Sequence, residues 1–345
     1  MDRDEEENTL GTMYGRSLMN WSNTTKIKPR QYFNLKQTVL GDASEYDDGF
    51  DELLKQTWNM WAVSTLFGFQ YDSEVQLKLY AKKLREEAAC SLLKEDVTYS
   101  AKFTLMDNLG PRPNPTDAPA VKIELIATSG AVERCIYKGF LISWRTELAE
   151  PITDKSVHLP LLLCRGTQNA MKTVHSIVSR MFDCTIVALP ITDNDLKWLL
   201  PINLSPESNN SRKVKNELIL LEYVVPRLPL TDTISVKFRV EDLKELWTAL
   251  ITPDVGEEDG LIIQAEHIEK IFKAINNQML QVGSLRLEHC LLHKVSLPFF
   301  TISGNRIKAM NSQALNNSML FLNEKAMDVL YTLHFESMQL DSSTA

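Results

Sequence analysis

His289 and His293 are the closest pair of histidines in the chain and the first candidates for metal binding, with Cys290 between them. On a helix, positions four apart place both imidazoles on one face, where one metal ion could reach them. On a strand the two side chains also share a face but lie about 13 Å apart. Residues 285–292 alternate between apolar and polar types, which predicts a strand and therefore no metal site.

The acidic pairs and the short motifs do not predict catalysis either. Asp193 and Asp195 fit the start of a helix, and Asp47 and Asp48 fit a loop. The sequence contains no GxGxxG, GxxxxGK[ST], GxSxG or HExxH motif and no kinase signature. Its five cysteines are widely spaced and form no CxxC pair, which favours small buried apolar residues over a disulfide framework or a zinc site. We therefore expect no enzyme, no catalytic residues and no cofactor.

Two groups of basic residues are candidates for contact with the phosphates of DNA. The first lies on a predicted helix and the second in a predicted linker: Lys78, Lys82, Lys83 and Arg85, then Arg212, Lys213 and Lys215. Solvated faces carry such charges too, so both interpretations stay open for each group. The net charge of −8 argues against a protein that holds DNA by itself, because binding to phosphates needs a basic surplus. Direct binding to the DNA backbone through the basic helix is the alternative function.

The elements that would position these residues indicate an α+β fold, rich in antiparallel sheet, with helices packed on the sheet. Period-two patterns predict strands at 66–71, 97–105, 121–125, 135–142, 218–225, 235–240 and 285–292, and a hairpin joining 299–303 to 306–310. Period-3.6 patterns predict helices at 50–61, 168–182, 192–200, 243–250, 268–279 and 323–335. A further helix is predicted to begin after a cap at Asp72 or Ser73. The short connections favour a meander rather than strand–helix–strand crossovers.

Four predicted elements carry more specific expectations. In the helix after residue 73 we expect Val75, Leu79 and Leu84 to point inward. Thr192 and Asp195 have the spacing of a capping box, and Pro201 is expected to end the helix that they begin. Residues 110–115 and 203–216 have the composition of loops.

The same patterns divide the chain into a tail and two lobes. Residues 1–48 are acidic or polar and are predicted to be disordered, residues 49–205 to form an N-terminal α+β lobe, and residues 206–345 a C-terminal α+β lobe. No run of eighteen apolar residues is present, so we expect no membrane span. The acidic N-terminus lacks the apolar region of a secretory signal, which leads us to expect the cytosol or the nucleus.

Four segments together resemble a known family. Residues 53–71 contain Trp58 and Trp61 followed by LFGFQY; residues 159–161 read LPL; residues 182–198 begin with FDC and end with LKW; and residues 240–247 read VEDLKELW. In this order and spacing they are similar to the centromere protein L family. The first 48 residues match nothing in the family, and from Leu285 onward only the strand pattern follows it.

The resemblance implies a structural subunit of the kinetochore in the nucleus, at the centromere of the chromosome. Members of the family pair with centromere protein N as a heterodimer, largely through sheet-forming C-terminal regions. The pair belongs to the constitutive centromere-associated network, which also binds centromere protein C and the H–I–K–M group. Contact with the centromeric nucleosome and its DNA is then expected mostly through the complex.

Strand addition at an exposed sheet edge would be the physical basis of such pairing. The candidate edge is the strand at 285–292 or the hairpin at 299–310. The partner-binding residues expected there are Leu285, Leu287, His289, Leu291, Phe299 and Thr301. Burial in an ordinary core explains the same apolar pattern equally well, so both interpretations stay open.

Overall fold

The structure is a computed structural model that describes residues 30–34, 50–93, 96–106, 109, 118–144, 156–204, 217–229, 231–251 and 262–343. Its main feature is a sheet of eleven strands in which every neighbouring pair is antiparallel. The strand order is β11 (Thr233–Arg239), β10 (Leu218–Val224), β13 (Leu291–Leu297), β14 (Phe300–Ser303), β15 (Arg306–Ala309), β2 (Thr57–Val63), β8 (Leu161–Gly166), β6 (Val132–Ile142), β5 (Ala120–Ser129) and β4 (Thr98–Met106). Strand β9 (Ile186–Ala188) also pairs with β2. The predicted α+β class is confirmed.

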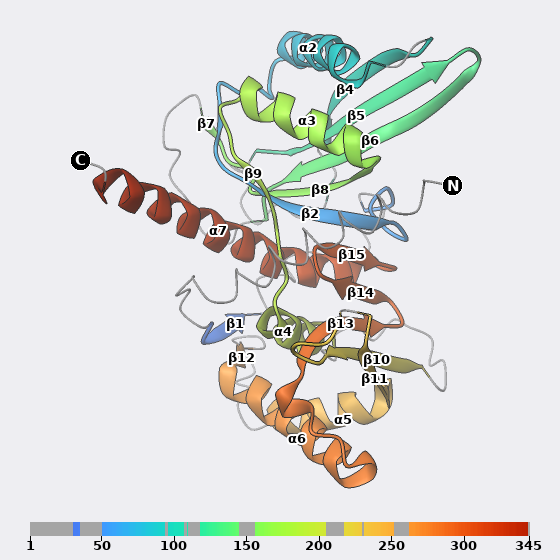
Figure 1. Ribbon diagram of the computed structural model, residues 1–345, viewed down its shortest axis with the longest axis vertical. Coiled ribbons are helices and arrows are strands. Elements are labelled where there is room, and N and C mark those ends of the chain that lie inside the picture. The colour runs from blue at the N-terminus through green and yellow to red at the C-terminus, as the bar shows by residue number, and fades with distance from the viewer. Residues whose placement is uncertain are drawn as a thin grey trace.

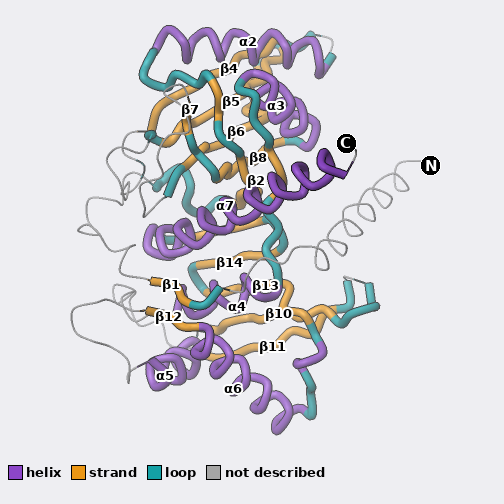
Figure 2. The backbone as a smooth tube through the Cα atoms, turned by 90° about the vertical axis from the view of Figure 1, so that its left-hand side faces the viewer, coloured by secondary structure: helices purple, strands orange, loops and turns teal. Residues whose placement is uncertain are grey.

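The helices cover this sheet at three levels along its length (Figure 1). Helices α2 (Glu74–Leu92) and α3 (Gln168–Met181) lie over the β4 end, and α5 (Val240–Ile251) and α6 (Ala265–Gly283) lie near the β11 end. Between them, α4 (Asp193–Leu204) contacts β13 and α7 (Ser312–Ser343) contacts β2, β8 and β15. In both views α7 crosses the middle of the molecule (Figures 1 and 2). Small pairs are formed by β1 (Tyr32–Asn34) with β12 (Ile262–Gln264) and by β3 (Leu66–Phe67) with β7 (Ser156–Val157).

Two groups of buried side chains hold these elements together. The α2–α3 core lies between α2, α3 and the β4 end of the sheet and includes Leu84, Phe103 and Val174. The α7 core is larger and includes Trp58 and Phe321, together with side chains from α4, α5 and α6. Because Trp58 and Phe321 come from opposite ends of the chain, the α7 core is built by both predicted lobes. The predicted boundary at 205/206 lies outside the described residues and stays a prediction.

The helix predicted for residues 50–61 is wrong, because residues 57–63 form the strand β2. Trp58, Met60 and Ala62 are buried at every second position, and β15 and β8 pair with the strand on its two sides. The indole N–H of Trp58 donates to the carbonyl of Leu53, 2.8 Å away. The helical spacing of apolar residues is therefore overruled by strand pairing with distant segments. The strand predicted at 66–71 shrinks to the two residues of β3.

Helices α2 and α4 are confirmed, with corrections to their details. Ser73 caps α2 as predicted, but Val75 and Leu79 are 68% and 51% exposed, and Leu77, Leu84 and Ala88 are the residues that α2 buries. The side chains of Thr192 and Asp195 form the predicted capping box of α4, each accepting from the backbone N–H of the other. Pro201 does not end α4, which continues to Leu204 because Leu200, Pro201 and Ile202 are all buried in the core.

A short part of the predicted N-terminal tail is folded. Strand β1 pairs with β12, and Phe33 is 2% exposed, with its ring 5.9 Å from that of Phe321 in a T-shaped contact. The guanidinium of Arg30 lies 4.6 Å from the Phe321 ring centre and pairs with Glu324. The prediction of a disordered tail is therefore wrong at residues 30–34. The loop predicted at 203–216 is wrong at its first two residues, which are buried in α4, and its other residues lie outside the described part of the chain, as does the loop predicted at 110–115.

Candidate interaction surfaces

The predicted partner-binding strand is not at an edge of the sheet. Residues 285–292 do not form one strand: a 3-10 turn occupies Leu287–His289, and β13 begins at Leu291. Strand β13 pairs with β10 and β14, and β14 pairs with β13 and β15. Strand addition at Phe299, Thr301 or their neighbours is therefore blocked by strands already present.

The side chains of the predicted set also fall into different environments. Leu287 is buried at 2% exposure in the α7 core, whereas Leu285 and Leu291 are 37% and 53% exposed. His289 is exposed and Thr301 is half-buried. Alternation of residue types could not distinguish a strand from a turn that buries one leucine. The partner-binding role itself stays a prediction.

His289 and His293 do not lie on one regular element, since the first is in the 3-10 turn and the second in β13. Burial lowers the pKa of His293. Within the described residues no three His, Cys, Asp or Glu side chains are grouped to hold a metal ion. The same residues include no helix with the length and apolar composition needed to span a membrane.

The outer strands of the sheet, among the described residues, are β11 and β4. Along β11 the side chains alternate, with Val236 and Phe238 buried and their neighbours in the strand exposed or half-buried. The pairing row Leu291–Val224–Thr233 runs from β13 across β10 to this edge. The alternation of β11 was visible in the sequence, but its outer position was not.

An exposed apolar segment lies beside the β11 end of the sheet. Its large side chains are Leu280 (46% exposed), Val282 (78%), Leu285 (37%) and Leu291 (53%). Leu280 and Val282 lie in the last turn of α6, and the C-cap residue Ser284 takes a left-handed conformation. The N–H of Leu285 donates to the carbonyl of Met279, 3.2 Å away. We call residues 280–291 the apolar segment.

The basic residues of α2 are exposed, but acidic residues offset part of their charge. Lys78 pairs with Glu74 at 2.8 Å and Arg85 with Glu86 at 3.3 Å. Lys82 and Lys83 have no ion pair with the described residues. The second basic group, Arg212, Lys213 and Lys215, lies outside the described residues, so the structure does not bring the two groups together.

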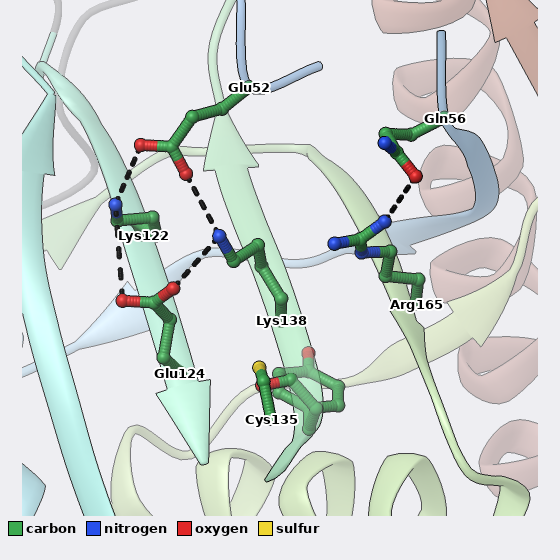
Figure 3. A network of polar contacts seen from close by, with 8 residues as sticks. Glu52, Gln56, Lys122, Glu124, Cys135, Lys138 and Arg165 are labelled. Atoms are coloured by element: carbon green, nitrogen blue, oxygen red, sulfur yellow. Dashed lines mark hydrogen bonds and ion pairs between the residues drawn. The ribbon is translucent and has the colours of Figure 1, made fainter. Parts of the chain in front are cut away.

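A ring of charges lies on the face of β5 and β6 turned away from α2 and α3 (Figure 3). Glu52 pairs with Lys122 at 2.8 Å and with Lys138 at 3.0 Å, and Lys138 also pairs with Glu124 at 2.9 Å. Burial opposes the charge of Glu52, but hydrogen bonds from both lysines outweigh it and lower the pKa of Glu52. The alternating charges satisfy one another, which indicates a structural tie between the sheet and residue 52.

The buried Cys164 and His175 resemble a thiol–imidazole pair, with Sγ 3.6 Å from Nε2. Burial raises the pKa of Cys164 to about 12 and lowers that of His175 to about 4. Both groups are therefore neutral at pH 7, and the thiolate that a nucleophile requires does not form. The ring of His175 lies 4.6 Å from that of Trp61 in an edge contact, as part of the α2–α3 core.

The chain is similar to known proteins over most of its length. The family model described as Centromere protein L matches residues 52–337. A curated relative, centromere protein L of Xenopus tropicalis, is 24% identical over 294 residues, which cover 80% of this chain and 79% of the relative. The family suggested by the four sequence segments is confirmed.

Proposed function

Because the chain belongs to the centromere protein L family, a family of structural centromere proteins, we propose that it is an inner-kinetochore subunit that pairs with centromere protein N. The match over residues 52–337 carries this proposal, since it covers nearly all of the described sheet and both cores. The pair would belong to the constitutive centromere-associated network, in the nucleus, with centromere protein C and the H–I–K–M group. Contact with the centromeric nucleosome would be made mostly through that complex.

We place the partner at the β11 end of the sheet instead of the β13–β14 region expected from the sequence. Strand β11 has one paired side within the described residues, so a strand of the partner can continue the sheet there. The apolar segment lies toward the same end of the sheet, since Leu291 is two strands in from β11 in the row Leu291–Val224–Thr233, and it offers side chains for a hydrophobic contact. An interface that combines backbone pairing with exposed leucines would hide both features from water.

Co-purification with centromere protein N tests this placement. We expect the double variant Leu285→Glu/Leu291→Glu to elute separately from the partner in size-exclusion chromatography, because two buried carboxylates would face an apolar contact. The matched control is Val75→Glu/Leu79→Glu, which adds the same charges at exposed apolar positions of α2. Equal binding by both variants would contradict the placement, and no binding by the unchanged chain would contradict the pairing itself.

Localisation tests the broader proposal independently. A fluorescent fusion of the chain should form spots that coincide with the centromeric histone H3 variant in interphase nuclei. Affinity purification from nuclei should recover other inner-kinetochore subunits. A diffuse signal with none of these subunits recovered would contradict a role at the kinetochore.

A further inference from the structure

A β-bulge decides which leucine of β13 points outward. The register of β13 against β10 shifts at His293, which is an extra residue in β13. Leu292 before it and Val295 after it are buried, whereas Leu291 is 53% exposed. An unbroken ladder, alternating from Val295, would turn His293 and Leu291 inward and Leu292 outward. The bulge therefore places Leu291 on the exposed side of the strand.

Burial of apolar area does not choose strongly between the bulged strand and an unbroken one. Each arrangement turns one leucine inward, either Leu292 or Leu291, so the apolar area removed from water is similar. A bulge also interrupts the ladder, and a backbone N–H beside it needs an acceptor. A polar contact beside the bulge can therefore decide which leucine is exposed.

Helix α4 provides that contact. The N–H of Leu292 donates to Oδ1 of Asp193, 2.7 Å away. The other carboxylate oxygen of Asp193 accepts from Nζ of Lys197 at 2.6 Å, and the same Nζ lies 5.9 Å from the ring centre of Phe272 on α6. A hydrogen bond to a charged acceptor is stronger than one to a neutral carbonyl. Asp193 thus joins β13 to α4 next to the bulge.

The apolar segment is held at both ends and in its middle. At the α6 end the N–H of Leu285 donates to the carbonyl of Met279, and at the β13 end Asp193 holds the residue after Leu291. Between them Leu287 is buried in the α7 core. The exposed Leu285 and Leu291 are therefore fixed in direction before a partner arrives, which lowers the entropic cost of binding.

We propose that Asp193 is a positioning residue for the contact between the apolar segment and the partner. It acts through the N–H of Leu292, which keeps the bulge in place and Leu291 outward. Without the carboxylate, β13 can take the unbroken ladder, which turns Leu291 inward while one leucine still fills the core. This inference rests on the proposed function, because it takes the apolar segment as part of the interface with centromere protein N.

Binding is measured by fluorescence anisotropy, with labelled centromere protein N titrated with the full chain. We expect Asp193→Ala to weaken binding about ten-fold, because a hydrogen bond to a charged group is lost and Leu291 leaves the interface. Asp193→Asn keeps an oxygen that can accept from the N–H of Leu292, so its affinity should stay within about three-fold of the unchanged chain.

Glu74→Ala is the matched control. Glu74 is the first residue of α2, as Asp193 is of α4, and it also pairs with a lysine four positions later, Lys78 at 2.8 Å. Its removal changes the same charge and the same helix position at the other end of the sheet. We expect its affinity to stay within about two-fold of the unchanged chain.

The variant Leu291→Ala separates positioning from general destabilisation. If Asp193 works by directing Leu291, adding Asp193→Ala to Leu291→Ala should lower the affinity further by less than about two-fold. In the unbound chain, hydrogen exchange at the amide of Leu292 should be faster in Asp193→Ala than in the unchanged chain or in Glu74→Ala. The thermal midpoint of each variant confirms that it is folded.

Four results would overturn the role of Asp193. They are unchanged binding by Asp193→Ala, an equal loss in Glu74→Ala, an undiminished effect of Asp193→Ala in the Leu291→Ala chain, and unchanged exchange at Leu292. The absence of binding by the unchanged chain would contradict the pairing with centromere protein N, on which the inference rests. The two failures are therefore distinguished by the unchanged chain alone.

Discussion

The two ends of the sheet are built differently although both end in an outer strand. At the β4 end, α2 and α3 cover one face of a meander whose strands follow one another in the chain, and the α2–α3 core draws only on residues 61–186. At the β11 end, the α7 core draws on segments from Phe33 to Val329. The β4 end is therefore built from one continuous part of the chain, whereas the rest of the fold depends on pairing between distant parts of the chain.

The largest expected loss of stability comes from truncating a buried side chain of the α7 core. Phe321 is 1% exposed and contacts Phe33, so Phe321→Ala should lower the free energy of unfolding by about 3–5 kcal/mol. Urea unfolding followed by tryptophan fluorescence measures the loss. Val75→Ala, at a position that is 68% exposed, is the control and should change stability by less than about 0.5 kcal/mol.

Hydrogen exchange on two variants tests whether the two ends of the sheet unfold independently of each other. Phe321→Ala should speed exchange in β2, β8 and β15, because α7 contacts all three strands. Leu84→Ala removes a fully buried side chain of α2 and should cost about 2–5 kcal/mol, with faster exchange confined to α2 and the β4 end. If both variants speed exchange over the whole sheet, the two ends form one cooperative unit and the contrast fails.

Acidification should weaken the α2–α3 core in particular. Burial lowers the pKa of His175 to about 4 in the folded chain, against 6.5 for an exposed histidine. The unfolded chain therefore takes up the proton first, and stability is lost as the pH falls from 6.5 toward 4, by about 2 kcal/mol at pH 5 and about 3 kcal/mol at pH 4. Urea midpoints at a series of pH values measure this slope.

The variant His175→Phe tests the assignment, because it keeps an aromatic ring beside Trp61 and removes the titrating group. Its stability should fall less steeply than that of the unchanged chain between pH 6.5 and 4. The variant Leu79→Phe adds an aromatic ring at an exposed, non-titrating position of α2 and is the control, so it should keep the slope of the unchanged chain. A slope that survives in His175→Phe would assign the acid sensitivity to other groups.

The same contrast explains what the sequence predicted. The strands β4, β5 and β6 were found because each alternates and each pairs with its neighbour in the chain, so local pattern and tertiary structure agree. Strand β2 was missed because its partners include Ile307, paired with Trp58 across most of the chain. No local pattern reports such a pairing.

The candidate surfaces could be predicted only in part, for a related reason. Alternation indicates that a strand is half-buried, but it does not say which strands flank it, so the interior β13 and the outer β11 look alike in sequence. The predicted partner-binding face included Leu285, Leu287 and Leu291. Leu285 and Leu291 are exposed as such a face requires, whereas Leu287 is buried because it lies in a 3-10 turn. The helix signals were stronger, since capping at Ser73 and Thr192 is local chemistry.

A buried amide joins α4 to α7 and should have a smaller effect than the core residues. The side-chain amide of Asn203 donates to the carbonyl of Leu199 at 2.9 Å and to the hydroxyl of Ser318 at 3.1 Å. Asn203→Ala should cost about 1–2 kcal/mol of the free energy of unfolding, since it leaves Ser318 with one partner fewer. A double-mutant cycle with Ser318→Ala isolates the pair, and a coupling energy near zero would show that the amide acts through Leu199 alone.

The smallest expected effect is at the charge ring of the β4 end. Glu52 is partly exposed, so Glu52→Gln should cost less than about 1 kcal/mol near pH 7, and the difference from the unchanged chain should shrink in 1 M salt. Because the pKa of Glu52 is lowered, its contribution is present above pH 4.5 and is lost as the pH falls through the lowered value. Glu86→Gln, at an exposed ion pair of α2, is the control. A loss above about 2 kcal/mol that persists in salt would mean that the ring fixes residue 52 to the sheet as firmly as a core contact, and the β4 end would then depend on a long-range tie as the β11 end does.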